Sequence, residues 1–250
     1  TTSKLQQAAA NRLGFTSRKT MQIAQQLYEG IQMGASRIGL ITYMRTDSVR
    51  ISQTAIEDVR SWIEKNYPDQ LPKSKIEYSV VKGAQDAHEA IRPTYVKYTP
   101  DSVKDYLSHD QLRLYSIIWE RFVSSQMNNA KTKTVSVDIQ AGDAIFRATA
   151  SRLSEKGFYN VIKVLSAKEE VSGNLPVLKI GEVLYSGKFY PEQHFTQGPA
   201  RYTDASIVKV LEEKGIGRPS TYAPIISVLL DRYYVTRSNK QLLPTQLGKI

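Results

Sequence analysis

The sequence predicts an α+β protein with more than one domain, because the spacing of apolar residues changes twice along its 250 residues. Residues 1–130 repeat apolar positions every three to four residues, which is the spacing of one face of a helix. Between about 131 and 200 apolar and polar residues alternate, as in strands, and 201–250 returns to helical spacing. We therefore expect a mainly helical lobe, a β-rich segment and a second helical segment, in that order.

Capping signals mark the first two helices. Ser3 and Gln6 have capping-box spacing at the start of a helix predicted over 3–13. A second helix is predicted over 17–29, and Gly30 stands where a helix of that length would end.

Similar signals mark the later helices of this lobe. A helix is predicted over 51–67 from the spacing of its aliphatic residues. Thr99 and Pro100 place a cap before a proline at the first helical position. Ser108 and Gln111 form a capping-box pair ahead of a long helix, LRLYSIIWERFVSSQM.

The middle segment has the alternation and turn residues of a small antiparallel sheet. We expect its strands at TVSVDIQ (134–140), AIFRATA (144–150), FYNVIKVL (158–165) and within GNLPVLKIGEVLYSG (173–187).

The last segment predicts two helices and a hairpin. A helix over 204–215 is followed by the turn IGRPS and a second helix over 220–232, and 233–245 has the alternation of a hairpin. Pro224 fits the second helix only within its first turn, where no amide hydrogen bond is lost. Helix, turn, helix and hairpin in this order outline a winged helix–turn–helix, a frequent DNA-binding element.

Composition favours a polyanionic partner. The chain carries 34 Lys and Arg against 24 Asp and Glu, a net charge of +10, so nucleic acid is the first candidate and an anionic membrane surface the second. The absence of cysteine excludes disulfides, thiolate catalysis and zinc–cysteine sites. No stretch approaches the ~20 apolar residues of a membrane span. The chain opens on Thr1 within a helix signal, which we interpret as a piece of a longer protein.

A first candidate site is ITYMRTDS, at 41–48, where a strand-like run ends on a tyrosine. If the segment is extended, Tyr43 and Arg45 point to one face, where Arg45 could stabilise a phenolate or hold a phosphate against the phenol. Thr46, Asp47 and Ser48 form turns and caps well, and would fix the position of the tyrosine. The structural alternative is a strand-end tyrosine followed by a helix cap.

The second and third candidates also place cations beside groups that bind anions. In DAHEAIRPT, His88 and Arg92 would share a face if the residues form a helical turn, with a phosphate between them; alternatively Glu89 simply neutralises Arg92. In GIGRPSTYAP, Arg218 precedes the start of a helix, where free amides favour an anion. Ordinary capping by Ser220 would explain that serine without explaining Arg218.

Clustered carboxylates for Mg²⁺, a phosphate-binding P-loop and a His-Glu-x-x-His motif are not found in the sequence. If the chain takes part in metal-assisted phosphoryl transfer, the metal ligands are expected elsewhere.

Taken together, the motifs resemble those of the type IA DNA topoisomerases, and bacterial DNA topoisomerase I fits best. The resemblance rests on ITYMRTDS, AHEAIRPT and GIGRPSTYA in this order, and on TSKLQQAAANRLGF and KTMQIAQQLYEG ahead of them. It covers nearly the whole chain and is weakest over 131–195. Reverse gyrase shares these motifs.

The resemblance implies a role for each motif. Tyr43 would attack a DNA phosphodiester, form a 5′-phosphotyrosine and release a 3′-hydroxyl, with Arg45 and His88 at the scissile phosphate. The strand would be held while another passes and then resealed, relaxing negative supercoils without ATP. Supporting residues would shape the pocket: Thr46, Asp47, Ser48, Glu89 and Arg92. Residues of the third motif would bind single-stranded DNA: Arg218, Ser220 and Thr221.

It also implies an architecture and partners. Residues 1–130 would be the tyrosine-bearing gate lobe, 131–200 part of an arch, and 201–250 part of a base domain that grips DNA. The cofactor would be Mg²⁺, held by a Toprim domain outside this chain, so the chain alone is expected to be inactive in relaxation. We expect a cytoplasmic, nucleoid-associated location and no membrane partner. The alternatives are a non-catalytic winged-helix DNA-binding module, or a partner-binding scaffold whose charge serves solubility.

Overall fold

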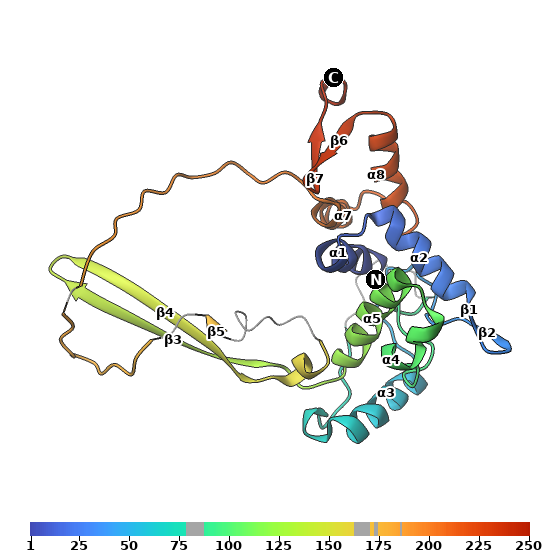
Figure 1. Cartoon of the computed structure of the whole chain (residues 1–250), viewed down its shortest axis with the longest axis horizontal. Coiled ribbons are helices and arrows are strands. Elements are labelled where there is room, and N and C mark those ends of the chain that lie inside the picture. Colours follow the sequence, from blue (N-terminus) through green and yellow to red (C-terminus); the bar gives the residue numbers. More distant parts are fainter. Residues whose placement is uncertain (79–87, 163–170, 173–174, 186) are drawn as a thin grey trace. The chain divides into compact units, whose positions relative to one another are not determined.

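The computed structural model contains helices and strands in two compact units (Figure 1). The first unit combines residues 1–128 with 201–250, and the second consists of 129–200. The segments 1–130 and 201–250, which the sequence patterns separate, therefore pack largely together. The structure describes residues 1–78, 88–162, 171–172, 175–185 and 187–250.

The helices of the first unit follow the predicted order. They are α1 (Thr2–Leu13), α2 (Ser17–Glu29), α3 (Gln53–Asn66), α4 (Pro100–Val103), α5 (His109–Ser124), α7 (Asp204–Glu213) and α8 (Tyr222–Asp231). Short 3₁₀ turns lie at Pro68–Gln70, Lys104–Tyr106 and Leu247–Lys249. The predicted caps at Thr99 and Ser108 are confirmed, and the latter is a complete capping box with Gln111. Pro224 lies in the first turn of α8, as predicted.

The predicted capping box of the first helix is wrong. Thr1 caps α1, because the helix begins at Thr2 and the Thr1 side chain accepts a hydrogen bond from the Lys4 amide. Ser3 and Gln6 are buried within the first turns, where Ser3 donates to a carboxylate of α7.

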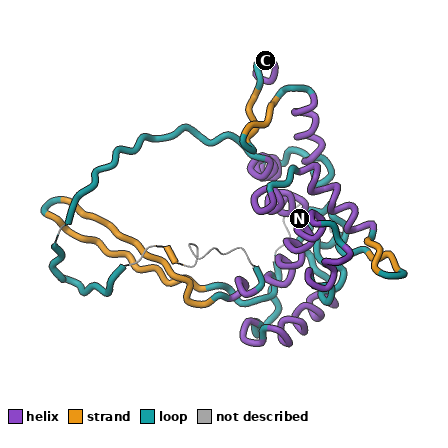
Figure 2. The backbone as a smooth tube through the Cα atoms, in the orientation of Figure 1, coloured by secondary structure: helices purple, strands orange, loops and turns teal. Residues whose placement is uncertain are grey.

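Helix α5 forms the centre of the first unit. Its buried face, which includes Leu114, Tyr115 and Ile118, packs against α1, α2 and α4. A smaller apolar cluster joins α7 to α8 through Val208, Leu211, Tyr222 and Ile226. Because α1 packs against α7 and α2 against α8, the last 50 residues are anchored on the first two helices (Figure 2).

Two small hairpins belong to the first unit. Strands β1 (Ile31–Met33) and β2 (Ser36–Ile38) pair antiparallel, and β6 (Val235–Ser238) pairs with β7 (Gln241–Pro244). The second hairpin confirms the prediction for 233–245. The expected strand IGLITYM is mostly absent: regular pairing ends at Ile38, and beyond it Ile41 makes only an isolated bridge to Pro93.

The second unit is dominated by one long hairpin. Strands β3 (Lys131–Ala141) and β4 (Ala144–Glu155) are antiparallel around the turn at Gly142 and Asp143, and β5 (Val171–Ser172) adds to β4. This confirms the first two predicted strands. Residues 157–160 form a 3₁₀ turn rather than a strand, and 175–185 contain no strand. The remainder of those two predictions, 163–165, 173–174 and 186, lies outside the described residues.

Candidate functional site

Tyr43 lies on an irregular segment and is 37% exposed. Its ring contacts Tyr28 of α2 at a centroid distance of 5.4 Å and His88 at 5.5 Å. The next residue, Met44, is buried, whereas Arg45 is exposed. This alternation leaves the phenol and the guanidinium accessible while the side chain between them anchors the segment in the core.

The buried side chain of Thr2 holds the segment that follows Tyr43. Its hydroxyl donates to the Met44 carbonyl at 2.7 Å and accepts from the Thr46 amide at 2.8 Å. Its own amide donates to the Thr46 carbonyl at 2.8 Å. The peptide groups on either side of Arg45 are therefore bound to the first residue of α1, 41 positions before Tyr43 along the chain.

The polar residues after Arg45 stabilise the local turn rather than a helix. Thr46 accepts a hydrogen bond from the Ser48 amide, and Ser48 accepts one from the Arg50 amide. The N-cap of α3 is Ser52. The alternative interpretation of 46–48 as a helix cap is therefore wrong, because the helix begins several residues later.

The second motif pairs with the first. The Thr42 amide donates to the Arg92 carbonyl at 2.9 Å, and the Arg92 amide donates to the Thr42 hydroxyl at 3.0 Å. Further backbone bonds tie the two segments together: Thr94 to Leu40 at 3.0 Å and Ala90 to Arg50 at 2.8 Å. This pairing brings His88 to the Tyr43 ring.

Arg92 is occupied by protein groups. Its guanidinium donates from Nε and Nη2 to one oxygen of Glu89, Oε2, at 2.9 and 2.6 Å, and also donates to the carbonyls of Pro93 and Thr94 and to Ser52. Residues 88–92 form no helical turn, so the arrangement of His88 and Arg92 on one helix face does not occur. Arg92 acts here as a brace for the segment, with its charge balanced by Glu89.

The third motif forms a tight turn before α8. The Arg218 amide donates to the Thr221 hydroxyl at 2.7 Å, and the Thr221 and Tyr222 amides both donate to the Arg218 carbonyl. Gly217 has φ +78°, and a Cβ there would lie 2.9 Å from the Thr221 hydroxyl. Thr221 is the N-cap residue, so Ser220 does not cap the helix. Those two amides are already bound, so an anion at this turn would have to use other groups, one of which is the exposed Arg218 side chain.

Electrostatic contacts place the first and third motifs near each other in the first unit. Burial raises the pKa of the Tyr222 phenol, the negative charges of Glu212 and Asp47 raise it further, and Arg218 opposes them. Glu212 also accepts a hydrogen bond from Ser3 at 2.7 Å. The start of α1 thus links the segment after Tyr43 with the end of α7.

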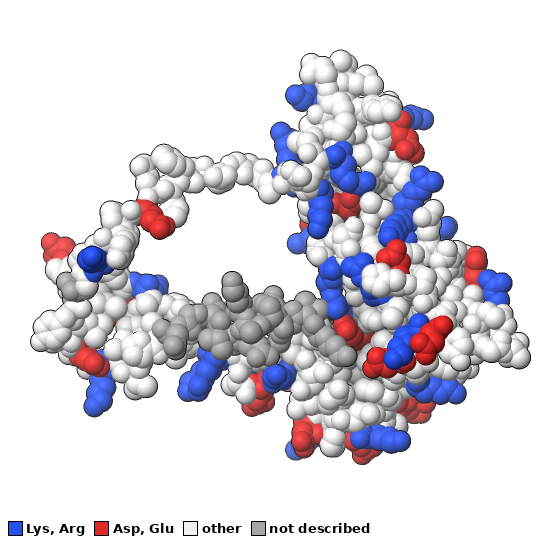
Figure 3. Space-filling model, viewed as in Figure 1, with Lys and Arg blue, Asp and Glu red and all other residues white. Residues whose placement is uncertain are grey.

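Lys and Arg side chains gather in a band over α7, α1 and α2 in the view of Figure 3.

Within the described residues, no group of three or more His, Asp or Glu side chains is placed to hold a metal ion. No described helix has both the length and the apolar character needed to cross a membrane.

Sequence reasoning missed Thr2, Tyr28 and Glu212 as neighbours of the candidate site. Tyr28 and Glu212 lie on helices that the sequence predicts, and Thr2 lies one residue before the predicted start of the first helix, all at positions where a polar or aromatic residue has no distinctive local pattern. Their contacts arise from packing between distant segments.

Comparison with known proteins identifies the family. A family model described as DNA topoisomerase matches residues 1–250. The chain is 62% identical over its whole length to DNA topoisomerase 1 of Treponema pallidum and 51% identical to that of Rickettsia felis. It covers 34% and 33% of these proteins, so it spans about a third of their length.

A solved structure agrees with this result. Full-length topoisomerase I from Thermotoga maritima is 38% identical and superposes with a TM-score of 0.81 over 99% of this chain and 40% of that one. The match extends over all three motifs, including the paired segments around Tyr43 and the turn before α8. The chain therefore belongs to the DNA topoisomerase family, which confirms the resemblance to type IA enzymes of the bacterial topoisomerase I kind.

Proposed function

We propose that this chain carries the nucleophile of a type IA DNA topoisomerase and part of its DNA-binding surface. The observation that supports the proposal most directly is the geometry at Tyr43: an accessible phenol beside the His88 ring, with Arg45 exposed two residues later. Hydrogen bonds also fix the backbone before Tyr43, through Arg92, and after it, through Thr2. A tyrosine with only a packing role would not require this.

In the proposed reaction the Tyr43 oxygen attacks a phosphodiester of single-stranded DNA. The new bond joins the phenol oxygen to phosphorus, the bond to the 3′-oxygen breaks, and a 3′-hydroxyl leaves with a proton. Arg45 balances the charge of the phosphate, and His88 lies on the same side as the phenol to contact it. Religation is the reverse step, which requires no ATP because the phosphoester bond is conserved in the covalent intermediate.

The other predicted residues would have supporting roles. Thr46 and Ser48 fix the turn after Arg45, Asp47 contributes negative charge near it, and the Glu89–Arg92 pair braces the segment that carries His88. Arg218, Ser220 and Thr221 would bind the backbone of the strand.

Magnesium would complete the site from outside this chain. When bound, Mg²⁺ would stabilise charge that develops on the phosphate and the leaving oxygen. Its ligands would come from a Toprim domain, and the described residues here would supply only the tyrosine side of the site. The chain alone is therefore expected to show no relaxation activity.

The proposed movement assigns a mechanical role to each segment. The lobe 1–130 would carry Tyr43 and its attached strand away from the base, 201–250, while 131–200 forms part of an arch. Because α1 packs on α7, such a movement would have to break contacts such as the Ser3–Glu212 hydrogen bond or leave α1 with the base.

Covalent capture tests the proposal. The chain is mixed with a separately made Toprim-containing half, Mg²⁺ and a labelled single-stranded oligonucleotide, and the products are separated on a denaturing gel. We expect a protein–DNA band that Tyr43→Phe abolishes while binding remains, since the substitution removes only the hydroxyl. Tyr106→Phe, at another exposed tyrosine, is the matched control.

The result also separates the alternatives. If the halves associate and bind DNA but give no Tyr43-dependent band, the winged-helix binding module is favoured, and deletion of 201–250 should then abolish binding. If affinity for DNA is insensitive to salt, the scaffold interpretation is favoured instead.

A further inference from the structure

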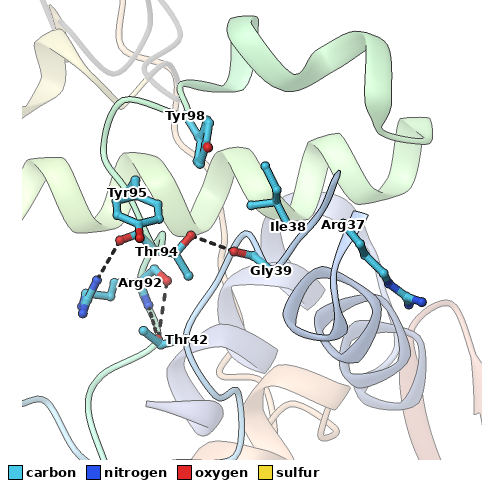
Figure 4. Close-up of a pocket in the computed structure, with 8 residues that line it drawn as sticks. All are labelled: Arg37, Ile38, Gly39, Thr42, Arg92, Thr94, Tyr95 and Tyr98. Atoms are coloured by element: carbon cyan, nitrogen blue, oxygen red, sulfur yellow. Dashed lines mark hydrogen bonds between the residues drawn. The ribbon is translucent and has the colours of Figure 1, made fainter. Parts of the chain in front are cut away.

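A pocket of about 610 Å³ lies beside the segment that leads into Tyr43 (Figure 4). Thr42, which lines it, is the residue immediately before Tyr43, and its other lining residues come from 37–39 and 92–98. None of the three sequence motifs accounts for the residues at 37–39 or 95–98.

The turn 94–98, which forms one wall, is firmly held. Its buried Val96 accepts a hydrogen bond from the Trp119 indole of α5 at 3.0 Å. Further bonds fasten both ends of the turn: Thr94 hydroxyl to Gly39 carbonyl at 2.8 Å, Tyr98 amide to Tyr95 carbonyl at 3.2 Å, and Tyr115 hydroxyl to Tyr98 carbonyl at 2.5 Å. The side chains that project from this turn are therefore presented on a rigid support.

Those side chains are aromatic and cationic. Tyr95 is 53% exposed, and its ring meets the Tyr98 ring nearly perpendicularly at 5.8 Å. The Lys97 ammonium lies 5.3 and 5.4 Å from the two ring centroids. An accessible aromatic ring beside a cation is the combination that binds single-stranded nucleic acid, because a base stacks on the ring while the cation balances a phosphate.

The two arginines of the pocket differ in their availability. Arg92 and Arg37 lie at opposite ends of the labelled residues in Figure 4, and the Arg92 guanidinium is fully engaged with protein groups. Arg37 uses its Nε to donate to the Gly30 carbonyl at 3.2 Å. Its stem lies against Gly30, where a Cβ would come 2.8 Å from the Arg37 Cγ. Within the described residues neither Arg37 nor Lys97 has a carboxylate partner.

We propose that this pocket is a subsite for single-stranded DNA, in which a base stacks on Tyr95 while Arg37 and Lys97 contact its flanking phosphates. It would take nucleotides on the 3′ side of the broken bond. This assignment rests on the proposed function, because a 5′-phosphotyrosine at Tyr43 leaves those nucleotides attached to the unit that carries the pocket. The subsite would retain the strand that is attached to Tyr43 while the other end of the break, which carries the 3′-hydroxyl, is separated from it.

Binding of a fluorescent single-stranded oligonucleotide to the 250-residue chain, measured by anisotropy over a salt series, is the first test. We expect Tyr95→Ala to raise the dissociation constant about tenfold and Tyr95→Phe to preserve it, because stacking needs the ring and not the hydroxyl. Tyr106→Ala removes a similarly exposed tyrosine outside the pocket and should have little effect. Equal losses from Tyr95→Ala and Tyr106→Ala, or no DNA binding by the chain, would overturn the subsite.

Charge is tested with a second matched pair. Arg37→Gln should lower the slope of log affinity against log salt by about 0.7, the loss of one phosphate contact on a single strand. Lys65→Gln removes the same charge from the exposed face of α3 and should leave the slope nearly unchanged. If both variants change the slope equally, the pocket contributes only general charge and the proposal fails.

Photo-crosslinking separates this proposal from the proposed function. In the capture mixture, oligonucleotides carry a photoreactive iodouracil at successive positions 3′ of the cleavage site, and crosslinked peptides are identified by mass spectrometry. A crosslink to the peptide containing Tyr95 supports the subsite, and crosslinks confined to other peptides overturn it. Capture that depends on Tyr43 without such a crosslink overturns the subsite and leaves the catalytic proposal intact. Capture that survives Tyr43→Phe refutes the catalytic proposal and, with it, the assignment of the subsite to the 3′ side of the broken bond.

Discussion

Replacing Thr2 with valine should loosen the segment that positions Tyr43. Valine has nearly the shape of threonine but lacks the hydroxyl, so the Met44 carbonyl and the Thr46 amide would each lose a buried partner. An unsatisfied buried group costs about 1–3 kcal/mol, and partial relaxation of the segment offsets some of the total. We therefore expect local opening to become easier by about 2 kcal/mol, roughly a 30-fold change in the opening equilibrium.

Hydrogen exchange at the Thr46 amide measures this opening directly. Exchange should accelerate about 30-fold in Thr2→Val, and covalent capture through Tyr43 should fall with it. Thr2→Ser keeps the hydroxyl and should retain most of the protection, so it is the matched control. An unchanged exchange rate in Thr2→Val, or equal effects of valine and serine, would refute the proposed role of the hydroxyl.

Three further predictions concern stability. Arg92→Lys should lower the free energy of unfolding by about 2 kcal/mol in urea titrations, because the lysine ammonium cannot reproduce the two hydrogen bonds that Nε and Nη2 donate to Glu89 Oε2; a change below ~0.5 kcal/mol would contradict the bracing role. Gly217→Ala should lower the free energy of unfolding by more than Gly215→Ala. Both glycines have positive φ, where alanine is strained by about 1 kcal/mol, but only at Gly217 would the new Cβ meet a side chain within 3 Å. Equal losses of unfolding free energy in the two variants would count against the described turn. Burial raises the pKa of the Tyr115 phenol above its ordinary value of 10.0. The neutral phenol therefore contributes its full stabilisation below about pH 10, and this contribution is lost as the pH rises further. The urea concentration at the unfolding midpoint should fall above about pH 10, and Tyr115→Phe should reduce that fall.

Local signals predicted most helices because the start and end of a helix are largely determined by residues close to them in the sequence. The capping box at Ser108, Pro100 at a helix start and Gly30 at the end of the second helix each act within a few positions. The same local rule failed at Ser3. Thr1, two residues earlier, caps the helix instead, and the Ser3 hydroxyl donates to a distant carboxylate on α7.

The candidate residues were predicted more completely than their contacts. The motifs indicated Tyr43 and His88 separately, but their ring contact depends on backbone pairing between Thr42 and Arg92, 50 positions apart. The strand predicted through Tyr43 is mostly absent, because β-forming side chains alone do not supply a partner strand and regular pairing ends at Ile38. In 175–185 apolar alternation likewise occurs without strand pairing.

The discontinuity of the first unit has a consequence for synthesis on the ribosome. Helix α1 packs against α7, so the first unit cannot complete its core until the whole second unit, about 70 residues, has been translated. At about 5–20 residues per second this interval lasts roughly 4 to 14 seconds. Throughout it the surfaces of α1 and α2 that receive α7 and α8 await their partners, and the nascent chain presents them to chaperones or to neighbouring chains on the same messenger RNA.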